Sequence, residues 1–143
     1  MPMITWDDEY SVDIQEIDEQ HKRLIGIINE LYEALAAKKE RDRVSTVLNE
    51  LVEYTKVHFA VEETLMRIFH YEEYDEHKAI HDRIVERVLD FQRQFNEGND
   101  AVGMELLIFL KNWLFDHINK VDKRYSTHFH KHGVKKNWLR RFW

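Results

Sequence analysis

The 143-residue sequence contains no cysteine, a single proline and only four glycines. The absence of cysteine excludes disulfides, iron–sulfur clusters and a thiol nucleophile, so any metal site must use His, Asp and Glu. So few turn-forming residues disfavour sheet-rich folds, which need many tight turns. The chain also lacks a basic, apolar leader and any run approaching the roughly 18 apolar residues of a membrane span. We therefore expect a cytoplasmic protein.

Basic residues are fewer than acidic ones: 21 Lys and Arg against 27 Asp and Glu give a formal net charge of -6. This balance excludes nucleic acid as a partner of the chain as a whole. Residues 128–143 are the exception, a basic aromatic extension with five Lys or Arg and no acidic residue. An apolar edge beside these cations would suit contact of residues 135–143 with a membrane surface or a partner protein. Packing on its own acidic bundle or on a second subunit is the simpler alternative.

Four long segments carry apolar residues at every third or fourth position, which is typical of amphipathic helices. They run over about residues 18–38, 43–69, 74–95 and 101–118, with Asp18 and Asp42 as expected N-caps and Gly98 as a helix stop. Short connections between such helices predict an all-α, up-down-up-down antiparallel four-helix bundle. We expect this bundle to form one domain over residues 1–127, beginning with an ordered N-terminal arm.

Six polar residues interrupt the apolar stripes that these helices would turn inward: His21, His58, Glu62, His77, His81 and His117. A single inward His is more often a hydrogen-bonded core residue than a ligand. Antiparallel neighbours, however, lie level when their sequence midpoint falls at the connecting turn, and the midpoints of these residues do so. All six are therefore expected in one layer of the core.

Five imidazoles and a carboxylate cannot all stay neutral and hydrogen-bonded to one another, and charging them in a core is costly. Metal ions resolve this conflict. The pairs His58/Glu62 and His77/His81 have i, i+4 spacing, which lets both side chains reach one centre. Because carboxylates bridge ions readily and six donors exceed what one ion usually accepts from protein, we expect a dinuclear site.

Asp122 is a seventh candidate ligand, five residues after His117. An ideal helix would rotate it by about 140° from the His117 face. Either Asp122 is a surface charge, or the helix is kinked or overwound between Asp116 and Asp122 so that the carboxylate turns inward.

The spaced set His21, His58-x-x-x-Glu62, His77-x-x-x-His81 and His117-x-x-x-x-Asp122 resembles the signature of bacterial hemerythrins. The segments WDDEYSVDIQEIDEQHK, HFAVEETLM, HKAIHD and WLFDHINKVDK are similar to that family's motifs, and the resemblance covers about residues 4–127. Such a spaced set is far more specific than one i, i+4 pair.

The resemblance implies a cofactor of two iron ions. One ion would be held by His77, His81 and His117, and the other by His21 and His58. Glu62, Asp122 and a solvent-derived oxo or hydroxo group would bridge both ions. The ion with two histidines would keep an open position, where dioxygen binds as the ligand.

The resemblance also implies an apolar oxygen pocket beside the open position, lined by Leu24, Phe59, Trp113, Leu114 and Ile118. Excluding water and protons would keep dioxygen binding reversible. We therefore expect reversible dioxygen binding, as a carrier, store or delivery protein, and not an enzyme. The alternatives are an oxygen or iron sensor or delivery module acting through a partner, and a di-iron oxidase or an enzyme that processes peroxide or nitric oxide.

Overall fold

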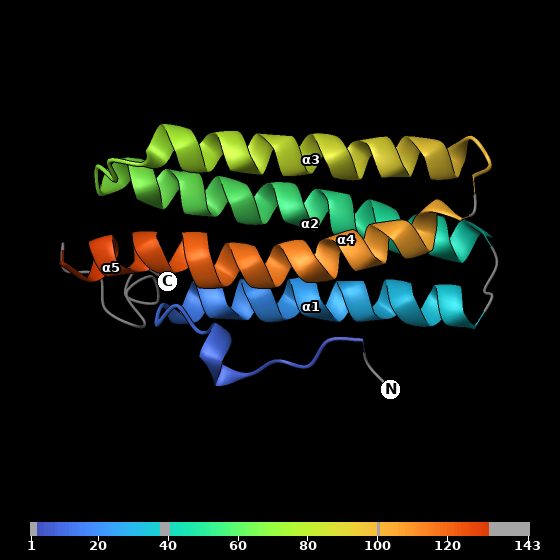
Figure 1. Cartoon of the computed structure of the whole chain (residues 1–143), viewed down its shortest axis with the longest axis horizontal. Coiled ribbons are helices and arrows are strands. Elements are labelled where there is room, and N and C mark those ends of the chain that lie inside the picture. The colour runs from blue at the N-terminus through green and yellow to red at the C-terminus, as the bar shows by residue number, and fades with distance from the viewer. Residues whose placement is uncertain (1–2, 38–40, 100, 132–143) are drawn as a thin grey trace.

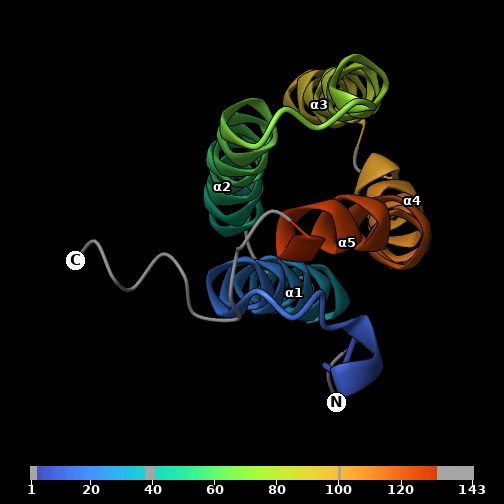
Figure 2. The same ribbon diagram turned by 90° about the vertical axis from the view of Figure 1, so that its left-hand side faces the viewer.

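The computed structural model describes residues 3–37, 41–99 and 101–131, and within them the chain is a bundle of antiparallel helices. The helices are α1 (Gln15–Ala36), α2 (Arg41–Ile68), α3 (Tyr74–Asn96) and α4 (Val102–Asp116). α4 continues without a break through the π-helical segment η2 (His117–Asp122) into α5 (Lys123–Lys131). Figures 1 and 2 show α1 beside α2, α2 beside α3, and α4 closing the ring between α3 and α1. The predicted up-down-up-down four-helix bundle is confirmed.

The ends of the helices agree only partly with the sequence prediction. α1 begins at Gln15, so Asp18 is not its N-cap; its carboxylate lies in the first turn and accepts hydrogen bonds from the Val12 N–H and the Ser11 hydroxyl. Asp42 likewise lies inside the first turn of α2. The stop at Gly98 is confirmed, because this residue has φ of 104°, a conformation that costs little only for glycine.

The inward faces of the helices pack into one core. Apolar positions predicted to be inward, such as Ile28, Leu51, Val88 and Leu106, are at most 2% exposed. Burying each such side chain contributes about 1.5–3 kcal/mol to stability, and this burial is the main force that holds the helices together. None of the described helices is both long enough and apolar enough to cross a membrane.

The N-terminal arm runs along the outer side of α1 and is ordered, as predicted (Figure 1). The Ile4 N–H donates to the side-chain oxygen of Asn29 at 2.9 Å, and the Asn29 amide donates back to the Ile4 carbonyl at 2.8 Å. Farther along, the Tyr10 ring packs on Phe115 of α4, with 4.6 Å between ring centroids. The arm thereby connects α1 to the last turn of α4.

α5 crosses the end of the bundle and contacts the chain just after α2 (Figure 2). Phe129 is fully buried and packs against Phe69, with 5.5 Å between ring centroids. His128 is half-buried and donates a hydrogen bond to the Phe69 carbonyl at 2.6 Å. The expected boundary between residues 127 and 128 falls inside this helix, and residues 135–143 lie outside the described part of the chain.

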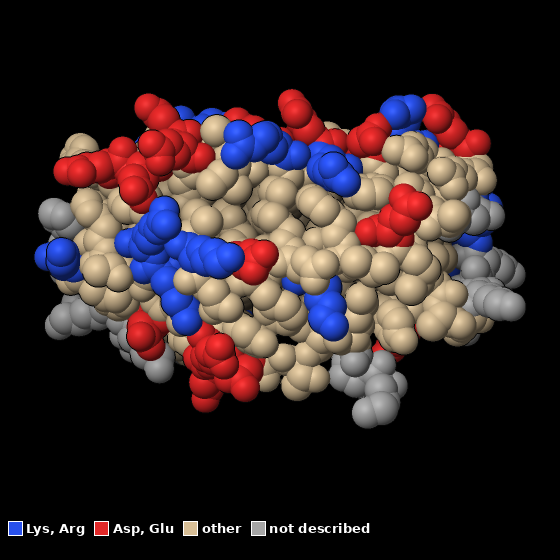
Figure 3. Space-filling model, in the orientation of Figure 1, with Lys and Arg blue, Asp and Glu red and all other residues tan. Residues whose placement is uncertain are grey.

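Basic side chains gather at the α5 end of the face shown in Figure 3, with acidic groups above and below them. η2 and α5 contribute Lys120 and Arg124 to the exposed surface and Lys123 to its edge. The basic character expected of the C-terminal extension therefore begins before residue 128.

Candidate metal centre

The structure brings together all seven predicted ligands inside the bundle, and none is more than 4% exposed. α1 supplies His21, α2 supplies His58 and Glu62, α3 supplies His77 and His81, and η2 supplies His117 and Asp122. One potential ligand atom from each of Glu62, His77, His81, His117 and Asp122 lies within 4.8 Å of the others, and the same limit holds for His21, His58 and Glu62. The single core layer expected from the spacing is present.

Glu62 faces two separate groups of imidazoles. Its Oε1 lies 2.6 Å from Nε2 of His58 and 3.3 Å from Nε2 of His21. Its Oε2 lies 3.3 Å from Nε2 of His81 and 3.7 Å from Nε2 of His77. One carboxylate thus turns a different oxygen toward each group.

Asp122 divides its oxygens between the same two groups. Its Oδ1 lies 2.9 Å from Nε2 of His117 and 3.3 Å from Nε2 of His77, whereas its Oδ2 lies 3.3 Å from Nε2 of His21. The centre therefore consists of a three-histidine group and a two-histidine group with two carboxylates between them. This is the arrangement that two ions with shared carboxylate ligands require.

The π-helical segment η2 explains how His117 and Asp122 share a face. A π-helix has i→i+5 hydrogen bonds, so residues five apart lie about one turn apart on the same side. The predicted departure from α geometry is confirmed, but the turn is widened and not overwound. Asp122 is fully buried, so it is not a surface charge.

The two carboxylates set the protonation of the metal-free centre. Burial alone would raise the pKa of Glu62, but the nearby His58 and hydrogen bonds from His21 and His58 lower it well below its ordinary value. Burial and the charge of Glu62 also oppose ionisation of Asp122, yet His117 and His21 bring its pKa below the ordinary range. Both groups are therefore carboxylates in the core.

The imidazoles respond in different directions. Burial lowers the pKa of His58 below its ordinary value. Burial also opposes protonation of His21, but the neighbouring carboxylates of Asp122 and Glu62 raise its pKa to about 9. Without a metal, a proton on His21 thus offsets part of the negative charge of the two carboxylates.

Several buried atoms that face the centre are not satisfied by the protein. Within the described residues, Oε2 of Glu62, Nε2 of His77 and both carboxylate oxygens of Asp122 have no hydrogen bond of good geometry. A buried unpaired polar atom costs about 1–3 kcal/mol, and metal coordination would satisfy it. Imidazole and carboxylate donors suit iron among the divalent metals, so the residues present fit a pair of iron ions.

The sequence did not predict two contacts to the outer ring nitrogens of ligand histidines. Gln20 accepts a hydrogen bond from Nδ1 of His58 at 2.7 Å, and Glu63 lies 2.9 Å from Nδ1 of His81. Each residue is next to a predicted ligand in the sequence but contacts a ring on a different helix. No periodicity signals such a pairing, because it depends on how neighbouring helices are rotated.

The residues predicted to line an oxygen pocket lie close to this layer. Leu24, Phe59, Leu114 and Ile118 are at most 3% exposed, and Trp113 is half-buried. Phe59 stacks on His81 with 3.7 Å between ring centroids, and Trp113 stacks on His117 at 4.9 Å. These two aromatic rings therefore contact the three-histidine group.

Fold and site together define a class: a four-helix-bundle protein with a buried, histidine-rich centre suited to two metal ions. Residues 12–128 match the family described as the hemerythrin HHE cation binding domain, and the chain belongs to the hemerythrin family.

Curated relatives and solved structures agree with this assignment. The chain is 42% identical over 125 residues to a bacteriohemerythrin of Pseudomonas aeruginosa (strain LESB58), covering 87% of this chain and 80% of that protein. It is 35% identical over 127 residues to a bacteriohemerythrin of Methylococcus capsulatus, covering 88% and 96%. A crystal structure of wild-type hemerythrin superposes with a TM-score of 0.78 at 33% identity, covering 87% of this chain and 96% of that one.

Proposed function

We propose that this protein binds dioxygen reversibly at a non-haem di-iron centre, as a carrier, store or delivery protein. The main support for this proposal is the position of Glu62 and Asp122. Each carboxylate turns one oxygen toward the three-histidine group and the other oxygen toward the two-histidine group. Two ferrous ions held there would supply dioxygen with two electrons, one from each ion, in a reversible exchange.

The ligand assignment follows the two groups. His77, His81 and His117 would hold one ion, His21 and His58 the other, and both carboxylates would be shared. The protein offers three imidazoles to the first ion and two to the second, so the second is the one with room for an exogenous ligand. This asymmetry supports dioxygen binding at the two-histidine position.

The apolar residues around the centre support reversibility. Leu24, Phe59, Leu114 and Ile118 are buried, and Trp113 covers His117 from the edge of the core. A mostly apolar lining would keep water and external protons away, and these would otherwise promote loss of the reduced ligand and irreversible oxidation. These five residues are proposed to form the wall of the oxygen pocket.

The set of ligand residues favours reversible dioxygen binding over oxidation catalysis. Oxygen-activating bundle enzymes typically use four carboxylates with two Glu-x-x-His motifs. Five neutral imidazoles and two carboxylates donate less negative charge to iron, which disfavours highly oxidised states. We therefore favour a binding protein over a di-iron oxidase.

The test is a cycle of loading and release. Protein reconstituted with ferrous iron without oxygen should contain two ions per chain. Admission of air should produce a visible absorption band that disappears under vacuum and returns with air. A single ion per chain, or a band that persists under vacuum, would overturn the proposal.

A further inference from the structure

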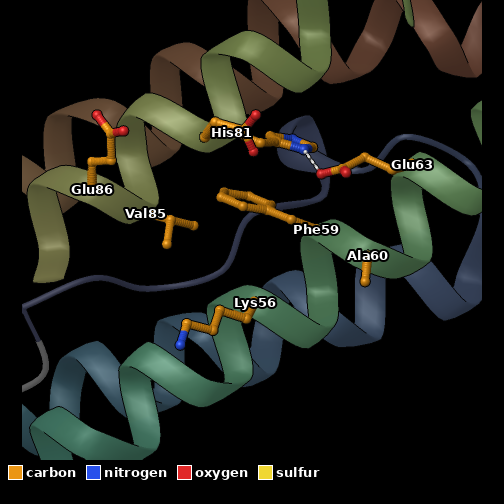
Figure 4. A pocket seen from close by; sticks show the side chains of 8 residues that line it. Lys56, Phe59, Ala60, Glu63, His81, Val85 and Glu86 are labelled. Carbon is orange, nitrogen blue, oxygen red and sulfur yellow. Dashed lines mark hydrogen bonds and ion pairs between the residues drawn. The ribbon is translucent and has the colours of Figure 1, made fainter.

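A groove of about 430 Å³ opens between α2 and α3 beside the candidate centre (Figure 4). The residues that line it include Lys56, Phe59, Glu63, His81 and Glu86. Phe59 stacks nearly parallel to the His81 ring, at an interplanar angle of 2°. Glu63 meets the edge of the same ring at Nδ1, at a distance of 2.9 Å.

This contact distinguishes His81 from the other four imidazoles of the centre. The Nδ1 atom of His58 meets the neutral amide of Gln20. Across the described ranges, the Nδ1 atoms of His21, His77 and His117 have no hydrogen-bond partner. Within that part of the chain, His81 is the one ligand candidate whose outer nitrogen meets an anionic group.

The position of Glu63 is itself supported. Its Oε1 lies 3.6 Å from Nζ of Lys78, which is also hydrogen-bonded to Asp82 one turn later on α3. Glu63 is 17% exposed, so it lies between the open groove and the buried ring. The carboxylate can therefore keep its charge while it holds His81.

We propose that Glu63 is a positioning residue that accepts the Nδ1–H of His81 and lowers the reduction potential of the metal centre. A carboxylate on the outer N–H increases the electron density at Nε2, the atom that faces the centre, and makes the imidazole a stronger donor. A stronger donor stabilises the more highly charged, oxidised metal. This inference rests on the proposed function, because it requires a metal ion at His81.

The experiment compares Glu63→Gln with Glu86→Gln in the iron-loaded protein. Both changes remove one negative charge from the groove, but Glu86 lies at the end of the groove away from Glu63 (Figure 4). Titration of the iron-loaded proteins with redox mediators should give a more positive midpoint potential for Glu63→Gln than for the wild type and for Glu86→Gln. Equal potentials for the two variants would overturn the inference.

A third variant tests positioning separately from charge. In Glu63→Gln the amide oxygen can still accept the Nδ1–H, whereas Glu63→Ala leaves the ring without a partner. Loss of such an outer contact typically weakens metal binding about tenfold or more, so Glu63→Ala should release iron to a chelator faster than Glu63→Gln. Equal release rates would contradict a positioning role.

The two proposals fail in different ways. A wild-type protein that does not hold two ions or does not release dioxygen overturns the proposed function. A wild-type protein that does both, with potentials unchanged by Glu63→Gln, overturns only the role of Glu63. Circular dichroism of each variant confirms that the bundle is intact before potentials are compared.

Discussion

The Ser126 hydroxyl donates a hydrogen bond to the carbonyl oxygen of Val12, joining residues 114 positions apart. Nearby, Nζ of Lys123 donates to the Glu9 carbonyl at 2.6 Å. With the packing of Tyr10 on Phe115, the arm contacts the last helix on both sides of η2. The arm therefore supports the widened turn that places His117 and Asp122 on one face.

Ser126→Ala should destabilise the protein at this junction. The buried Val12 carbonyl would lose its side-chain donor, at a cost of about 1–3 kcal/mol in the free energy of unfolding. Thr127→Ala is the matched control, because the exposed Thr127 hydroxyl bonds to the Lys123 carbonyl of its own helix and its loss should cost less than about 0.5 kcal/mol. Urea unfolding of the metal-free proteins measures both values. Equal losses of unfolding free energy in the two variants would show that the bond from Ser126 to Val12 adds no particular stability.

Asp122→Asn should weaken iron binding. The amide keeps the shape of the side chain but removes one shared anion, so the iron pair would carry an additional uncompensated charge in a buried site. We expect fewer than two ions per chain after dialysis against a weak chelator. Asp116→Asn is the control, since Asp116 is 73% exposed and lies just before η2. Full loading of Asp122→Asn would contradict a bridging role.

Leu114→Ala should shorten the lifetime of the oxygenated protein. Leu114 is 1% exposed, and its truncation would remove apolar cover from the wall of the proposed oxygen pocket and admit water. The decay of the visible band in air should be faster than in the wild type. Ile108→Ala, a change at a 55% exposed position of α4, should decay at the wild-type rate. An unchanged lifetime for Leu114→Ala would remove this residue from the proposed pocket.

The metal-free protein should lose stability as the pH rises from 7 to 9. The pKa of His21 is raised to about 9, so its contribution is complete below its ordinary pKa of 6.5 and is lost as the pH approaches 9. His81, whose pKa is also raised, adds to the same trend. Urea unfolding across this range should show a decline of at most about 1.4 kcal/mol per pH unit for each group, and the decline should be smaller in His21→Gln. A stability that rises with pH would contradict this assignment.

Iron binding should have the opposite dependence on pH. An ion at the two-histidine position must replace the proton on His21, so loading at neutral pH should release a proton and tighten as the pH rises toward 9. Proton release is measured by calorimetry in buffers of different ionisation enthalpy. Loading without proton release would show that His21 is neutral before the metal binds.

The sequence by itself determined the bundle and most of its centre. Apolar spacing of three and four residues sets the inward face of a helix, and short connections make neighbouring helices antiparallel. Those two facts place six residues at one level without any knowledge of side-chain contacts: His21, His58, Glu62, His77, His81 and His117. The fold and the core layer were therefore predictable from periodicity and chain length between turns.

Only the tertiary structure decided the features that depend on contacts between elements. The segment from His117 to Asp122 has no local signal that requires a π-helix, and the turn widens where the buried histidines surround Asp122. Asp18 binds the arm and does not cap α1, because the chain before the helix folds back on it. The pairing of Glu63 with His81 likewise depends on the rotation of α2 against α3, which side-chain packing determines and helical periodicity does not.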